Sequence, residues 1–178
     1  MVDLRILEKE DLALFAEWVN NPDFYGDCDI LDQRARNEIE KRFENSPPED
    51  RKFVIQKKDG TRVGIIASEL HSEYGGFLEI GFNIVPDERG KGYCSEAARI
   101  MIDYLFLSKT LDRIQARTDT RNLSSQKVLE KTGFKKEGQL RKAAFIRGVW
   151  TDLFIYSILR EEWKEPKILT KHQIKKAS

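Results

Sequence analysis

The sequence predicts an α/β (α+β) fold in which helices flank a central twisted, mixed and mostly antiparallel sheet. In the first half of the chain, three strand-like segments are joined by glycine-containing turn signals, of which Asp59-Gly60 is the strongest. In the second half, strand patterns alternate with helical ones, an order that favours a mixed sheet. With 178 residues, the chain is expected to form one domain that is large enough to bury a core.

The first half is expected to begin with a strand and two helices. Residues Val2 to Leu7 alternate as in a strand, and Asp11 is placed to cap a helix that ends at Asn20-Asn21-Pro22. A mostly exposed helix is expected from Asp32 to Asn45. After a loop, strands are expected at 52–57, 62–71 and 77–85.

The second half alternates helices and strands. A broad apolar face predicts a helix from Ser95 to Leu107. A second helix, from Asn122 to Lys131, is closed by Gly133, in the usual place for a left-handed residue. Strands are expected at 113–118, 134–140 and 151–159. The lysine-rich residues 164–178 follow as a basic C-terminal tail, which leaves 1–163 as the single predicted domain.

Composition narrows the classes of function. Lys and Arg number 31 against 30 Asp and Glu, so no strong overall charge attracts nucleic acid or an anionic membrane. The two cysteines, Cys28 and Cys94, are too few for a disulfide framework or a Cys-rich zinc site. No apolar run approaches the roughly 20 residues of a membrane span, and no signal-peptide pattern opens the chain. We therefore expect a cytoplasmic monomer or homodimer without a metal, nucleic-acid or membrane partner.

Residues 84–94 carry the strongest functional signal. A β-rich run ends at Pro86, a basic turn with Gly90 and Gly92 follows, and a helical pattern then begins. Glycine lets the backbone approach a ligand closely, and the free N–H groups at a helix N-terminus attract anions. Arg89 and Lys91 add two positive charges. The segment therefore predicts a binding site for a phosphorylated ligand.

Two common phosphate motifs do not fit this turn. A P-loop needs Gly-x-x-x-x-Gly-Lys-Ser/Thr, whereas Gly90 and Gly92 are only two residues apart. A Rossmann turn needs a third glycine where Ser95 stands. The turn instead resembles Arg/Gln-x-x-Gly-x-Gly/Ala, the pyrophosphate-binding signature of the GNAT superfamily of acetyltransferases. Arg89 and Gly92 match it, while Cys94 replaces the last small residue.

Three further segments carry the resemblance, in the right order and at compatible spacing. Asn122 to Phe134 and Gly148 to Trp163 are similar to segments of the Rim-type branch, the ribosomal-protein N-terminal acetyltransferases. The start, with Leu4-Arg5 and a helix near Asp11, is similar as well. The resemblance implies the GNAT fold and an enzyme that passes acetyl directly from acetyl-CoA to a primary amine, without a metal.

The resemblance also implies which residues form the site. A bulge near the end of the strand that contains Phe82 to Val85 would turn backbone N–H groups toward the thioester oxygen. These N–H groups would then form an oxyanion hole. The pantetheine arm would pair with the exposed edge of this strand, and Ser125 would hydrogen-bond or protonate the sulfur. The expected cofactor-binding residues are Phe82, Asn83, Ile84, Val85, Arg89, Gly90, Lys91, Gly92, Tyr93, Cys94, Asn122 and Ser125. Asn122 is also placed as an ordinary N-cap.

The sequence identifies the general base and the acceptor amine less clearly than the cofactor-binding residues. Glu79 is the candidate base, beside Ser125 as the second candidate catalytic residue, and the amine could also react without a dedicated base. Four aspartates after the first helix would suit a cationic acceptor, and a solvated acidic loop is the alternative: Asp23, Asp27, Asp29 and Asp32. Alternative functions are a polyamine or aminoglycoside-type antibiotic acetyltransferase. A non-catalytic acyl-CoA-binding module is a further alternative, because Arg141 to Phe145 lacks the glutamate of some relatives.

Overall fold

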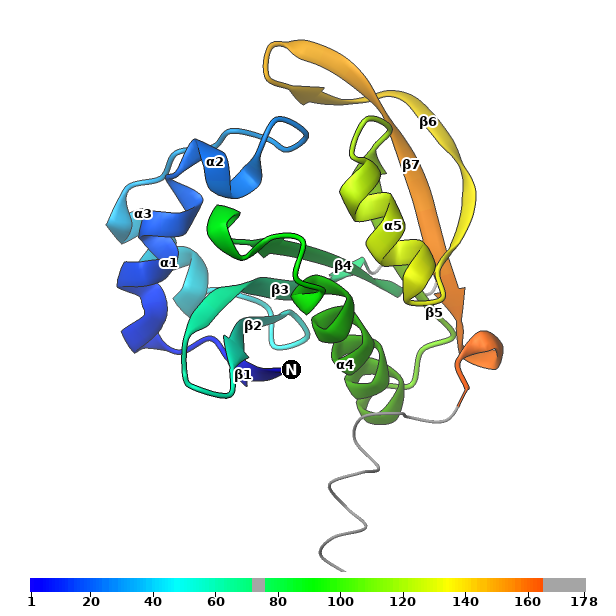
Figure 1. Cartoon of the computed structure of the whole chain (residues 1–178), viewed down its shortest axis with the longest axis horizontal. Coiled ribbons are helices and arrows are strands. Elements are labelled where there is room, and N and C mark those ends of the chain that lie inside the picture. Colours follow the sequence, from blue (N-terminus) through cyan, green and yellow to red (C-terminus); the bar gives the residue numbers. More distant parts are fainter. Residues whose placement is uncertain (72–75, 165–178) are drawn as a thin grey trace, which may run out of the picture.

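A computed structural model of the chain describes residues 1–71 and 76–164. Its centre is one seven-stranded sheet in the order β1-β2-β3-β4-β5-β7-β6 (Figure 1). The strands are β1 (Val2–Ile6), β2 (Arg51–Lys57), β3 (Arg62–His71), β4 (Phe77–Ile84), β5 (Arg113–Asp119), β6 (Lys135–Ile146) and β7 (Val149–Leu159). Among these seven described strands, only β4 and β5 pair in parallel, so the predicted mixed and mostly antiparallel sheet is confirmed. The predicted tail lies outside the described residues from 165 onward.

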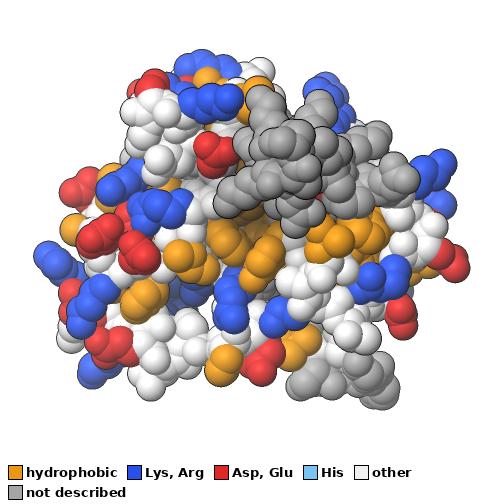
Figure 2. Space-filling view, turned by 90° about the horizontal axis from the view of Figure 1, so that it is seen from below, with side chains coloured by type: hydrophobic (Ala, Val, Ile, Leu, Met, Phe, Trp, Pro, Cys, Tyr) orange, Lys and Arg blue, Asp and Glu red, His pale blue; other side chains and the backbone are white. Residues whose placement is uncertain are grey.

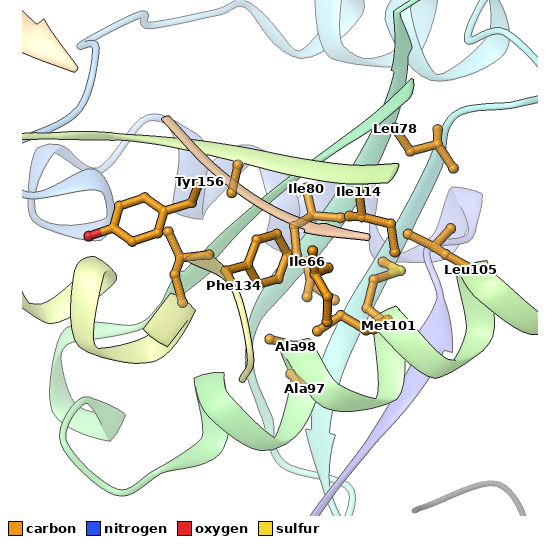
Figure 3. Packing of buried hydrophobic residues seen from close by; sticks show 14 of the residues in the cluster. Ile66, Leu78, Ile80, Ala97, Ala98, Met101, Leu105, Ile114, Phe134 and Tyr156 are labelled. Carbon is orange, nitrogen blue, oxygen red and sulfur yellow. The ribbon is translucent and has the colours of Figure 1, made fainter. Parts of the chain in front are cut away.

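Helices cover both faces of the sheet. On one face, α4 (Tyr93–Ser108) and α5 (Leu123–Lys131) close the main core, and Figure 3 shows Met101 and Leu105 of α4 packed toward Ile80 and Ile114 of the sheet. On the other face, α1 (Leu12–Val19), α2 (Pro22–Tyr25) and α3 (Arg36–Glu44) form a smaller cluster. Short 3-10 turns are η1 (Lys9–Asp11), η3 (Pro86–Glu88) and η4 (Arg160–Glu162). No described helix is both long and apolar enough to cross a membrane.

The surface carries charges of both signs. Figure 2, seen from below, shows Lys, Arg, Asp and Glu side chains distributed around a central group of hydrophobic ones. This mixture agrees with the formal net charge of +1.

Two helical predictions need correction. Asp11 does not cap α1 with its side chain; its Oδ2 accepts the Glu8 N–H at 3.0 Å, and the turn η1 precedes the helix. The short helix α2 was not predicted, because Pro22 reads as the end of α1. Proline is also favoured at the first position of a helix, and Asn21 caps α2 by accepting the Asp23 N–H at 2.9 Å.

The last two strands are longer than predicted. They continue to a two-residue turn at Arg147 and Gly148, whose φ values of 51° and 83° are those of a type I′ hairpin. The pairing slips between Leu140 and Ala144, so β6 bulges, and Lys142 has a positive φ there. The hairpin rises beside α5 and arches toward α2 (Figure 1).

The parallel pair β4–β5 is short and creates an opening. Pairing between these strands is confined to Leu78↔Ile114 and Glu79↔Gln115. Beyond Glu79 the two strands diverge. The predicted bulge in β4 is not seen in its ladder with β3, which runs in continuous register from His71↔Phe77 to Gly64↔Ile84. Divergence of β5, rather than a bulge in that ladder, opens the edge of β4.

Candidate active site

The opening leads into a cavity of about 610 Å³, which we call the cofactor-side cavity. The end of β4, the turn before α4 and the start of α5 form its walls. Ten of the predicted cofactor-binding residues line it: Phe82, Asn83, Ile84, Arg89, Gly90, Gly92, Tyr93, Cys94, Asn122 and Ser125. Val85 and Lys91 are not in the lining. The fold therefore brings residues 82–94 and residues 122–125, which are separate in the sequence, to one cavity.

The backbone of β4 offers hydrogen-bond donors to this cavity. The Val85 N–H donates to Val63 O at 2.9 Å, so the N–H groups of alternate residues point toward β3. Those of Phe82 and Ile84 consequently point to the opposite side, where β5 has diverged. Free N–H groups at a strand edge can pair with an extended amide or stabilise a developing oxyanion.

The turn before α4 leaves space for an anion. Gly90 and Gly92 have φ values of 76° and 85°, and a Cβ built on either would meet no atom within 4 Å. Gly92 is also the N-cap of α4, so the first N–H groups of a 16-residue helix face the same cavity. Tyr93 and Cys94 also pack against the main core. Burial raises the pKa of the Cys94 thiol to about 12, which makes it an inert, neutral wall.

The two basic side chains of this turn do not project freely into the cavity. The Arg89 guanidinium donates to Ile84 O at 3.0 Å and to Asp23 O and Phe24 O at 2.6 and 2.8 Å. Lys91 Nζ lies 2.9 Å from Glu88 Oε2. Arg89 therefore ties the turn before α4 to α2, a role that a short motif does not reveal.

Helix α5 supplies the side chains on the opposite wall. Asn122 caps the helix by accepting the Ser125 N–H at 3.0 Å, so its N-cap role is present. Within the described part of the chain, the Ser125 hydroxyl makes no hydrogen bond. Farther along the same helix, Lys127 and Lys131 also line the cavity, which the sequence reasoning missed. Their spacing of four residues on the helix that carries Ser125 was the available signal.

A second cavity of about 410 Å³ lies on the other face of the sheet, and we call it the acceptor-side cavity. Tyr25 and Asn83 line both cavities, so the two meet beside β4. Glu79 lines the second cavity, but its carboxylate accepts hydrogen bonds from Arg117 Nε at 2.9 Å and Gln115 Nε2 at 3.1 Å. The candidate base is thus already held in an ion pair.

Asp29 is the aspartate of the predicted acidic loop that reaches the acceptor-side cavity. Burial raises the pKa of its carboxyl, while hydrogen bonds from the Ile30 N–H and the Asn83 side chain, and the charge of Arg147, oppose the rise. Asp23 is exposed, Asp27 lines the other cavity, and Asp32 pairs with Arg34. The four aspartates therefore do not form one site.

Comparison with known proteins agrees with this geometry. Residues 2–135 match the family described as acetyltransferase (GNAT) domain. The chain belongs to the GNAT acetyltransferases. A relative named probable N-acetyltransferase YjcK, from Bacillus subtilis, is 34% identical, over 88% of this chain and 86% of that protein.

Two solved structures share the fold. Spermidine N-acetyltransferase from Vibrio cholerae, in complex with CoA and spermine, has a TM-score of 0.82 at 23% identity and covers 90% of this chain and 96% of its own. Ribosomal-protein-S5-alanine acetyltransferase from Vibrio fischeri has a TM-score of 0.77 at 23% identity, covering 92% and 96%. The chain is thus an acetyl-CoA-dependent N-acetyltransferase with the GNAT fold.

Proposed function

We propose that the protein acetylates a primary amine held in the acceptor-side cavity, using acetyl-CoA held in the cofactor-side cavity. The observation that carries the proposal is the open edge of β4, which lies where the two cavities meet. Acetyl-CoA supplies an activated acetyl thioester. The protein has to hold acetyl-CoA and the amine next to each other, and to place hydrogen-bond donors where negative charge develops on the acetyl oxygen.

The residues present fit coenzyme A. The open backbone at Gly90 and Gly92 and the N-terminus of α4 suit its diphosphate, with Lys127 and Lys131 as further cations. The edge of β4 suits the amides of its pantetheine arm. The N–H groups of Phe82 and Ile84 stabilise negative charge on the acetyl oxygen, and the Ser125 hydroxyl assists departure of the sulfur.

Two carboxylates, Glu79 and Asp29, are candidates for the general base that removes a proton from the amine. Glu79 stays a prediction, although Arg117 and Gln115 occupy its oxygens. Asp29 lies in contact with Asn83, which lines both cavities, and its raised pKa suits a proton acceptor. The acceptor is proposed to be a protein N-terminus or a small amine. Both cysteines are free thiols, which supports a reducing, cytoplasmic setting.

The cofactor assignment is tested by Gly92→Val, compared with Gly60→Val. Both glycines have a positive φ (85° and 88°) and open space, but Gly60 lies in the β2–β3 turn, outside both cavities. Calorimetry with acetyl-CoA should show affinity weakened at least about tenfold for Gly92→Val only, because the branched side chain occupies the anion position. Equal affinity in both variants would refute the assignment.

Turnover is tested by following free thiol with a panel of amines. Thiol release above the protein-free rate with at least one amine supports the proposal. Tight acetyl-CoA binding without such release for any amine would favour the non-catalytic alternative.

A further inference from the structure

We propose that the acceptor-side cavity selects a peptide N-terminus followed by acidic side chains, and that it discriminates against polyamines. This inference rests on the proposed function, because it identifies the acceptor of the same site. It is carried by the charges that line the cavity and by the shape of its floor.

Seven charged side chains line the acceptor-side cavity: Asp29, Glu69, Glu79, Arg34, Arg42, Lys52 and Arg117. Two of the cations are already paired within the protein. Arg117 Nε lies 2.9 Å from Glu79 Oε2, and Arg34 donates to Asp32 Oδ2 at 2.8 and 2.5 Å. Because their charges are neutralised within the protein, Arg117 and Arg34 contribute little to binding a charged ligand.

Two cations and two carboxylates remain: Arg42, Lys52, Asp29 and Glu69. Within residues 1–71 and 76–164, none of the four takes part in a salt bridge. A polyamine carries several ammonium groups and no anion, so Arg42 and Lys52 would repel it. An acceptor that carries both an ammonium group and an anionic group would satisfy both signs.

The sheet sets the distance between those groups. Lys52 of β2 pairs with Ala67 of β3, and Ala67 pairs with Gly81 of β4, so the three share one face and one row. Two strand spacings of about 4.8 Å separate the first from the last, or roughly 10 Å. Asn83, where the two cavities meet, lies two residues beyond Gly81 on the same face.

The floor of this row is unobstructed. Ala67 is small, and a Cβ built on Gly81 would meet no atom within 4 Å. An extended peptide rises about 3.3 Å per residue, so about three residues span the row. With its ammonium group beside Asp29 and Asn83, such a peptide presents its second to fourth side chains to Lys52. Acidic side chains there complement the free cations.

The test compares kcat/KM for short peptides that share an N-terminal alanine and differ in residues two to four, which are glutamate, glutamine or lysine. Spermidine is the fourth acceptor. The wild-type protein is expected to prefer the glutamate peptide over the glutamine peptide by about tenfold, and to be slowest with the lysine peptide and spermidine.

Charge reversal at Lys52 separates this inference from the proposed function. Lys52→Glu should invert the ratio of rates for the glutamate and lysine peptides, while Lys58→Glu, at an exposed position outside both cavities, should not. Equal rates for all peptides, an unchanged ratio in Lys52→Glu, or a preference for spermidine would overturn the inference and leave the acetyltransferase assignment intact. Acetylation of no amine at all would overturn both.

Discussion

Asn122 and Ser125 lie on the same turn of α5 and differ in what their side chains can still do. Asn122 Oδ1 accepts the Ser125 N–H at 3.0 Å, which stabilises the start of the helix. The Ser125 hydroxyl has no partner within the described residues and faces the cofactor-side cavity. The sequence suggested both residues for the cofactor, but their different roles depend on the direction of each side chain, which spacing alone does not give.

Replacing Ser125 with alanine should slow turnover more than it weakens binding. If the hydroxyl assists departure of the sulfur, as we propose, its loss should lower kcat by about 10- to 1000-fold. The affinity for acetyl-CoA should change little, because the proposed site binds the ligand mainly through backbone N–H groups. Steady-state kinetics and calorimetry measure the two quantities. Ser108→Ala, at an exposed position outside both cavities, is the matched comparison, and a kcat for Ser125→Ala equal to that of this control would make Ser125 structural.

Asp29 and Glu79 can be separated by the pH dependence of kcat/KM. Burial raises the pKa of Asp29, so its carboxyl protonates at a higher pH than an ordinary aspartate. If Asp29 accepts the proton, activity falls as pH drops through this raised pKa, and Asp29→Asn lowers kcat/KM by tenfold or more and removes the acid limb. Glu79→Gln should then keep that limb. Loss of the limb in Glu79→Gln alone would assign the base to Glu79.

At the scale of elements, α2 is held by two arginines from distant parts of the chain. Arg89 donates to Asp23 O and Phe24 O, and Arg147 from the β6–β7 turn donates to Pro22 O and Gly26 O at 3.1 and 2.9 Å. The order of the strands and main helices was predictable from periodicity. These contacts were not, because they join residues more than 60 positions apart through backbone carbonyls, which leave no pattern in the side chains.

Removing the Arg147 contacts should impair use of the amine more than it weakens binding of acetyl-CoA. Arg147→Asn deletes the guanidinium but keeps a residue that tolerates the positive φ of 51°. We expect the KM for the amine to rise about three- to tenfold, since α2 ends with Tyr25 and precedes Asp29, which both line the acceptor-side cavity. Affinity for acetyl-CoA should fall less than the KM for the amine rises, because Arg89 still holds α2 through Asp23 O and Phe24 O. Arg141→Asn, on the same hairpin, is the control, and identical kinetics in both variants would contradict the coupling.

Across the whole molecule, the site lies where two separate cores meet at the sheet. The larger core packs α4 and α5 on one face, and the smaller packs α1 and α3 on the other. The sequence predicted where the turn with Gly90 and Gly92 and the start of α4 would lie, because both depend on local backbone. The sequence did not predict how the acceptor-side cavity is assembled. Its walls come from α2, the acidic loop and the row of Lys52, Ala67 and Gly81, and the pairing register of these strands cannot be read from the sequence.

Asp11 connects the smaller core to the sheet. The carboxylate is 1% exposed, and its Oδ1 lies 2.6 Å from Arg5 of β1 and 3.5 Å from Arg62 of β3. Burial alone would raise its pKa, but the hydrogen bonds from Arg5 and the Glu8 N–H, together with the charge of Arg62, outweigh burial and lower it. A lowered pKa means that the folded protein binds this proton less readily than the unfolded chain does.

Asp11→Asn should therefore cost stability at neutral pH, and the cost should shrink in acid. At pH 7 we expect a loss of roughly 2 to 3 kcal/mol in the free energy of unfolding, because Arg5 loses its anionic partner. The Asp11 contribution is complete above the unfolded aspartate pKa of about 3.9 and disappears as pH falls through the lower folded pKa. Urea unfolding between pH 7 and 3 measures both effects, with exposed Asp3→Asn as the control. A loss that stayed constant over this range would show that Asp11 contributes through packing and hydrogen bonding instead of through its charge.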